Sequence, residues 1–157
     1  MDIVIGITAT LAILGTAVIF GTDVLTAVVL RPSYAEVGDE AMVQLVGRSH
    51  HYGDKRLPIA GIGGAVFTGL TAGIAFIAGA WASGILALTA LVLLFVWLGI
   101  FGRVSAPINK TLTAAAFAGE VPADTRTLQA RWDSVIVLRS VLQGAALLLL
   151  CAAIVLA

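Results

Sequence analysis

Two charged side chains, Asp23 and Arg139, fall inside long apolar stretches of the chain. Asp23 lies eight residues before Arg31, and Arg139 lies seven residues after Trp132. Because a helix rises about 1.5 Å per residue, and Arg31 and Trp132 are expected at the cytoplasmic surface, each charge lies roughly 10 Å below that surface. A charge alone in lipid costs about 2.5–3.5 kcal/mol, so an ionisable residue there is a candidate for function. The matched depths predict an ion pair, which either only stabilises helix packing or forms the floor of a cytoplasm-facing cavity.

Further polar groups surround this pair in the sequence. One face of the last stretch carries an aromatic ring, a cation and an amide. The residues that share this face by helical spacing are Trp132, Val135, Ile136, Arg139 and Gln143. Pro107 predicts a kink, because it leaves the carbonyl of Arg103 without its helical donor. The kink would point the Asn109 amide toward the same region, and capping of a helix end is the alternative role. We therefore regard Trp132, Asn109 and Gln143 as candidate substrate-binding residues.

Two adjacent histidines, His50 and His51, precede the second apolar stretch. They are either solvated loop residues or have an acid/base or metal-binding role. No apolar stretch contains a histidine, which argues against a haem held by two histidines between helices. The chain also lacks CxxC, HExxH, P-loop and GxGxxG motifs, so no metal or cofactor is predicted. The candidate catalytic residues are Arg139 as anion stabiliser and Asp23 or His50 as base.

The composition is that of a membrane protein. The 157 residues are 60% hydrophobic and 11% charged, with a mean hydropathy of +1.06, whereas soluble domains are about 25% charged. A soluble domain of this size cannot hide so much apolar surface. This excludes a soluble enzyme and a disordered chain, and the single Cys151 excludes a disulfide framework. Nine basic and nine acidic side chains give no net charge, so the predicted partner is a lipid bilayer and not nucleic acid.

Four stretches are long and apolar enough to cross a bilayer as helices, at about 3–30, 57–80, 84–103 and 134–157. Backbone groups in lipid must be satisfied internally, so we expect residues 1–157 to form a single all-α domain, an integral membrane bundle of four transmembrane helices. Lysines and arginines gather in the two long connectors, and the chain ends carry none. The positive-inside rule then predicts a multi-pass protein of the cell membrane, with both long connectors cytoplasmic and both termini outside.

The connectors and the second stretch carry patterns of their own. Apolar residues recur at helical spacing in Val37, Ala41, Met42, Leu45 and Val46, which predicts an amphipathic cytoplasmic helix between the first two spans, along the membrane surface or capping the bundle. Gly119–Pro122 is expected to end one helix, and Asp124 or Thr125 to begin the next. A ridge of small residues predicts close packing within the bundle or between two copies, at Gly61, Ala65, Gly69 and Gly73.

Several of these residues resemble the anthrone oxygenase-like family. The resemblance rests on a long first stretch ending at Arg31-Pro32, on Pro107 and Asn109 after the third stretch, and on Trp132 and Arg139 entering the fourth. Most members of that family are bacterial four-helix membrane proteins of unknown function. A few fungal members are implicated in oxidising anthrones to anthraquinones with molecular oxygen, with no recognised metal or flavin. The resemblance implies the same fold and an oxidoreductase activity without a cofactor.

This chain departs from the family pattern at two places. The family often has asparagine where this chain has Ser105, and it often has asparagine or histidine within the segment that holds Val135, Ile136 and Val137 here. If that polar group takes part in the family's chemistry, this protein lacks it.

The sequence thus leaves two main hypotheses for function. The first is a cofactor-independent oxygenase or oxidoreductase that acts on a lipophilic aromatic, such as an anthrone or a quinol, with Trp132 stacking on its rings. The alternative is a non-catalytic membrane anchor or assembly subunit, whose partner would be a second copy or a larger membrane complex. A transporter is a third interpretation, but the chain shows neither the internal repeats nor the broken helices typical of that class.

Overall fold

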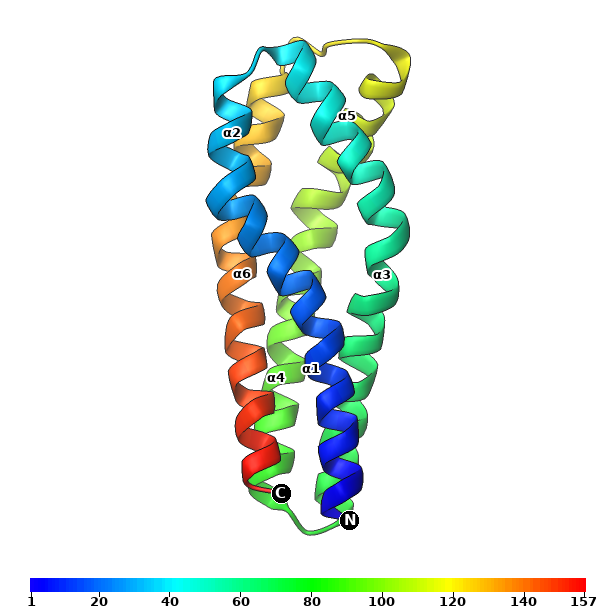
Figure 1. The fold of residues 1–157 in the computed structure, drawn as a ribbon, viewed down its shortest axis with the longest axis vertical. Coiled ribbons are helices and arrows are strands. Elements are labelled where there is room, and N and C mark those ends of the chain that lie inside the picture. Colours follow the sequence, from blue (N-terminus) through cyan, green and yellow to red (C-terminus); the bar gives the residue numbers. More distant parts are fainter. The chain divides into compact units, whose positions relative to one another are not determined.

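The computed structural model describes residues 1–157 and contains helices and no strands. The elements are α1 Asp2–Leu25, the π-helical turn η1 Thr26–Leu30, α2 Arg31–Glu36, α3 Asp39–Ile77, α4 Trp81–Ile100, the π-helical turn η2 Phe101–Ser105, α5 Ala106–Ala118 and α6 Thr125–Val155 (Figure 1). Four helical stretches are long and apolar enough to cross a membrane: Asp2–Glu36, Asp39–Ile77, Trp81–Ala118 and Thr125–Val155. The predictions of an all-α chain and of four apolar helices are confirmed. Membrane insertion and orientation stay predictions.

The chain packs into two compact units, each built from segments of all four helical stretches. The apolar unit comprises Met1–Gly21, Leu57–Trp97 and Val141–Ala157, and the connector unit comprises Thr22–Arg56 and Leu98–Ser140. Every charged side chain except that of Asp2 belongs to the connector unit. The chemistry that charged groups can perform is therefore concentrated in the connector unit. The expectation of one domain over residues 1–157 stays a prediction.

Small side chains fill the interior of the apolar unit. Its core consists of Ala12, Ala72, Ala87, Ala90, Leu94, Ala146 and Leu150. A Cβ atom built on Gly15 of α1 would lie 2.7 Å from the carbonyl oxygen of Ala60 and 2.8 Å from the backbone nitrogen of Gly64 in α3. The absence of side chains at both glycines thus lets the two backbones touch. In Figure 1 both chain ends and the α3–α4 turn lie at the same end of this unit.

The predicted ridge of small residues on α3 is not the face that is buried within the apolar unit, and its packing between two copies stays a prediction. Gly73 is exposed, and Gly61, Ala65 and Gly69 are only half-buried. The buried face of α3 consists instead of Gly64, Thr68, Thr71, Ala72 and Ala75. Small residues occupy most positions from Ala60 to Ala75, so their spacing alone does not determine which face meets α1. The contact at Gly15 determines it.

Replacing Gly15 with alanine is expected to lower the free energy of unfolding by about 1–3 kcal/mol, because a methyl group there overpacks a backbone contact. Gly6→Ala on the same helix is the matched control, because its added Cβ has no neighbour within 4 Å. Unfolding by sodium dodecyl sulfate in mixed micelles, followed by circular dichroism, measures both variants. Equal stabilities for the two variants would contradict the close approach.

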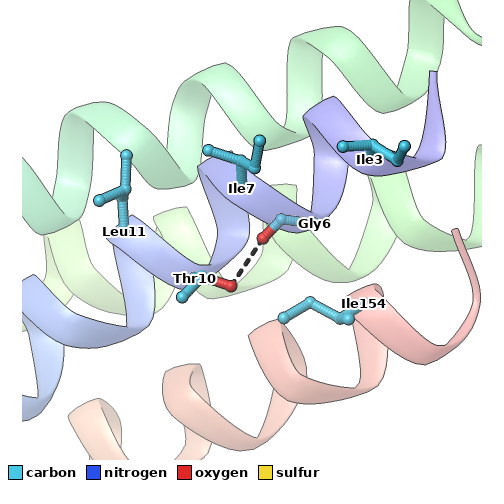
Figure 2. Close-up of a pocket in the computed structure, with 6 residues that line it drawn as sticks. All are labelled: Ile3, Gly6, Ile7, Thr10, Leu11 and Ile154. Atoms are coloured by element: carbon cyan, nitrogen blue, oxygen red, sulfur yellow. Dashed lines mark hydrogen bonds between the residues drawn. The ribbon is translucent and has the colours of Figure 1, made fainter.

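An apolar groove of about 340 Å³ lies on the apolar unit between α1 and α6. Figure 2 shows its lining, which consists of Ile3, Gly6, Ile7, Thr10, Leu11 and Ile154. The hydroxyl of Thr10 donates to the carbonyl of Gly6 at 2.7 Å, within its own helix. None of the candidate catalytic or substrate-binding residues lines this groove.

Packing in the connector unit corrects the prediction of an amphipathic surface helix. α3 begins at Asp39 and continues without a break to Ile77, after a turn at Val37 and Gly38. Met42, Val43 and Val46 are buried in a core with α5 and α6, whereas Ala41 and Leu45 are exposed. A Cβ atom on Gly47 would collide with the carbonyl oxygen of Leu112, so the backbones of α3 and α5 touch. The apolar face is therefore buried against other helices of this unit.

Each π-helical turn ends two residues before a proline. Pro32 and Pro107 occupy the first turns of α2 and α5, and each removes a backbone donor. The wider turns close with the N–H of Arg31 donating to the carbonyl of Thr26, and the N–H of Ala106 to that of Phe101. The first helical stretch therefore runs past the predicted end of the span at Leu30 and continues through α2 to Glu36. The irregularity predicted at Pro107 takes the form of η2.

The expected break after α5 is confirmed. Gly119 ends the helix in a left-handed conformation with φ of +72°, which glycine adopts without strain. α6 begins at Thr125, runs through Trp132 and continues to Val155. Near its start, Arg126 donates to Asp39 at 2.6 Å and to the carbonyls of Tyr34 and Val37. This arginine ties the α2–α3 turn to α6 within the connector unit.

Candidate active site in the connector unit

Asp23 and Arg139 form the ion pair that their matched depths predict. Nη2 of Arg139 lies 2.8 Å from Oδ1 of Asp23, and the two side chains are 4% and 6% exposed respectively. Nη1 of Arg139 donates to the hydroxyl of Ser105 at 2.7 Å. Ser105 is the last residue of η2, so the π-helical turn supplies one of the arginine's acceptors. Three separate segments of the connector unit thus meet at one buried guanidinium.

Two aromatic rings lie against this guanidinium. Its Cζ atom is 5.4 Å from the ring centroid of Trp132 and 5.3 Å from that of Phe101. Ring faces attract a cation at such distances, which offsets part of the cost of burying the charge. The Nε atom of Arg139 is buried and has no hydrogen-bond partner. The arginine therefore keeps one N–H available for an acceptor that the protein itself does not provide.

Asn109 connects Trp132 to an exposed carboxylate. The indole nitrogen of Trp132 donates to Oδ1 of Asn109 at 2.8 Å. Nδ2 of Asn109 donates in turn to both carboxylate oxygens of Asp54, at 3.0 and 3.1 Å. Both ends of the amide are therefore fixed, and so is the ring beside Arg139.

Sequence reasoning missed Asp54, which lies on α3 four residues after His50. A spacing of four residues places two side chains on one helical face. That signal has meaning only once this segment is known to be helical. In a connector of unspecified structure, the spacing carries no such information.

His50 belongs to α3, so the interpretation as a solvated loop residue is wrong. Its ring centroid lies 5.5 Å from that of Trp132, and its Nε2 atom is buried without a hydrogen-bond partner. His51 points elsewhere, with its ring 4.8 Å from that of Phe117 and its Nε2 atom 3.0 Å from Nζ of Lys55. Only the first of the two histidines therefore borders the arginine network.

The connector unit brings together Asp23, His50, Asn109, Trp132 and Arg139, five of the six candidate site residues. The sixth, Gln143, is fully buried on α6 but belongs to the apolar unit. Its role in substrate binding stays a prediction. No three His, Cys, Asp or Glu side chains gather in a way that could hold a metal ion.

The fold and the site together define a class: an all-helical chain with four membrane-length apolar helices and a buried, ion-paired polar network. Comparison with known proteins adds no relative to this description. No family model matches the chain, and neither the curated proteins nor the solved structures give a match.

Proposed function

We propose that this protein is a multi-pass membrane oxidoreductase that binds a lipophilic aromatic, such as an anthrone or a quinol, beside Arg139 and promotes its oxidation by molecular oxygen. The observation that carries the proposal is the buried guanidinium, which has two aromatic rings beside it, a carboxylate on one side and an unpartnered Nε atom. The guanidinium can stabilise the negative oxygen of a phenolate or enolate by its charge and by a hydrogen bond from Nε. The aromatic rings beside it provide a surface on which the ligand's own ring can stack.

The sequence resemblance to the anthrone oxygenase-like family supports the same proposal. Of its motif residues, Trp132 contacts two others: its indole nitrogen donates to Asn109, and the guanidinium of Arg139 lies against its ring. Ser105 stands where the family often has asparagine, and its hydroxyl accepts from Arg139. A hydroxyl therefore fills the polar role at that position.

The first chemical step is removal of the acidic proton of the substrate. Asp23 accepts this proton and becomes a neutral acid, and the substrate oxyanion takes over as the counter-ion of Arg139. The net charge around the arginine is the same before and after the transfer. The electrostatic free-energy cost of the step is therefore small, although the site is buried. His50 is the alternative base, with its buried and unpartnered Nε2 atom.

The second step is the reaction of the electron-rich anion with oxygen. For an anthrone, the methylene carbon loses two hydrogens and gains a carbonyl oxygen from O₂, and the other oxygen atom leaves as water. The substrate is oxidised and O₂ is the only oxidant. Asp23, Arg139 and Trp132 act by forming and holding the anion.

A second candidate function is a non-catalytic membrane anchor or assembly subunit, acting with a second copy or a larger complex. The observation that favours it is the extent of internal pairing, because Asp23, Ser105, Asn109 and Asp54 all bond to partners within the connector unit. Such a network stabilises helix packing even without a ligand.

The wild-type protein in lipid nanodiscs is expected to raise the rate of O₂ uptake with anthrone by about 10²-fold over empty nanodiscs, the lower range for general acid–base catalysis. An oxygen electrode measures the rate, and one O₂ is consumed per anthrone oxidised. The matched control substrate is 9-methoxyanthracene, which carries no acidic proton and is expected to give the background rate. An anthrone rate equal to that of empty nanodiscs would contradict the oxygenase activity and favour the subunit function.

A further inference from the structure

The exposed carboxylate of Asp54 stands at the end of a chain of contacts that leads to the buried guanidinium of Arg139. It accepts hydrogen bonds at 3.0 and 3.1 Å from the amide nitrogen of Asn109, whose amide oxygen accepts at 2.8 Å from the indole nitrogen of Trp132. The ring of Trp132 lies 5.4 Å from the Cζ atom of Arg139. All four residues belong to the connector unit. A surface charge is thus linked through two neutral groups to a buried charge of opposite sign.

The two neighbours of Asn109 allow only one orientation of its amide. An indole nitrogen can only donate a hydrogen bond, and an ionised carboxylate can only accept one. The amide oxygen therefore faces Trp132, and the amide nitrogen faces Asp54. Asn109 is only 2% exposed, so its amide bonds to these protein partners in place of bulk water. The direction of the chain of hydrogen bonds follows from the chemistry of its two ends.

Asp54 has no ion-pair partner that would hold its carboxylate elsewhere. The ion pairs of the chain use the carboxylates of Asp23, Asp39 and Asp133. Both oxygens of Asp54 accept from Asn109, and a hydrogen bond to an ionised carboxylate is roughly twice as strong as one between neutral groups. The strongest hydrogen bond of the buried amide is therefore the one that it makes to a surface residue.

We propose that Asp54 is a positioning residue, which acts through Asn109 to hold the ring of Trp132 against Arg139. Hydrogen bonds in a chain polarise one another, so the carboxylate makes the amide oxygen a stronger acceptor for the indole N–H. The stronger bond keeps the ring at the distance where its face attracts the guanidinium. The consequence for a ligand rests on the proposed function, in which the ring of Trp132 stacks on an aromatic substrate.

Hydrogen exchange of the tryptophan indoles tests this positioning role without any substrate. Nuclear magnetic resonance of the full chain in detergent micelles, with isotope-labelled tryptophan, follows each indole N–H separately. In Asp54→Ala the N–H of Trp132 is expected to exchange with deuterium about fivefold faster than in the wild type, the factor for one net hydrogen bond. Trp81 and Trp97 belong to the apolar unit, so their exchange rates are expected to stay unchanged.

Two further variants separate the charge of Asp54 from its hydrogen bond and from a general loss of surface charge. Asp54→Asn keeps an acceptor oxygen without the charge, and its Trp132 exchange rate is expected between those of the wild type and Asp54→Ala. The matched control Glu40→Gln removes an exposed carboxylate from the same helix and is expected to keep the wild-type rate. Equal Trp132 rates in Asp54→Ala and Glu40→Gln would overturn the proposal. Equal acceleration of all three indoles would also overturn it, because Asp54 would then contribute to global stability alone.

The kinetics of anthrone-dependent O₂ uptake in lipid nanodiscs test the consequence for a ligand. Asp54→Ala is expected to raise KM for anthrone about fivefold and to keep kcat within about twofold of the wild type, because ring stacking stabilises bound substrate and transition state equally. A lower kcat at an unchanged KM would indicate a loss of folded protein and would overturn the positioning role. A wild-type rate at background would contradict the proposed function, and the exchange of the Trp132 indole would still decide the role of Asp54.

Discussion

Replacing Asp23 with asparagine is expected to lower the free energy of unfolding by about 3–5 kcal/mol, the usual cost of removing one partner from a buried ion pair. The variant leaves the guanidinium of Arg139 in a place where it is only 4% exposed and has lost its counter-ion. Ser105 accepts one of its hydrogen bonds but carries no charge. Unfolding by sodium dodecyl sulfate in mixed micelles, followed by circular dichroism, measures the loss.

The double variant Asp23→Asn/Arg139→Gln is expected to recover more than half of that stability. Two neutral amides replace the two charges, so no uncompensated charge remains, and a buried pair contributes little net stability over a neutral replacement. Asp133→Asn is the control, because the Arg31–Asp133 pair is longer, at 3.7 Å, and partly exposed. Its removal is expected to cost about 0–1 kcal/mol. A single Asp23→Asn variant as stable as the control would contradict the buried pair.

The fold was predictable where hydrophobicity alone decides it. Apolar stretches of about 20 residues identify four membrane-length helices, because no soluble core could bury them. The Asp23–Arg139 pair was also predictable, because a buried charge needs a partner and only two charges lie deep in apolar stretches. Trp132, Ile136 and Arg139 share a buried face on α6, as their helical spacing predicts.

The rest depended on how helices meet, which one-dimensional patterns do not specify. The segment around Met42 has the same amphipathic pattern whether its apolar face contacts lipid or another helix. In the structure this face packs against α5, and Gly47 allows the close approach of the two backbones. Small residues lie on several faces of α3, and the sequence does not show which face packs against α1. In the structure α1 packs on the face that contains Gly64, where Gly15 allows backbone contact. Asp54 bonds to Asn109 of another helix, and spacing along α3 does not specify that contact.

The double variant Asp23→Asn/Arg139→Gln also separates chemistry from packing. Proton acceptance by Asp23 and anion binding by Arg139 are each expected to contribute a factor of about 10² or more to the rate. If the pair only stabilised helix packing, a folded neutral pair would leave any activity intact. The variant is therefore informative because it is expected to fold while it lacks both charges.

The most direct test of the central claim, that the buried pair acts chemically, is the rate of anthrone-dependent O₂ uptake by this folded double variant in lipid nanodiscs. Arg131→Gln serves as the control, because it removes an exposed arginine from the same helix. We predict that the double variant falls to the rate of empty nanodiscs while Arg131→Gln keeps the wild-type rate. A wild-type rate in the double variant would contradict a chemical role for Asp23 and Arg139. It would indicate that the pair only stabilises helix packing.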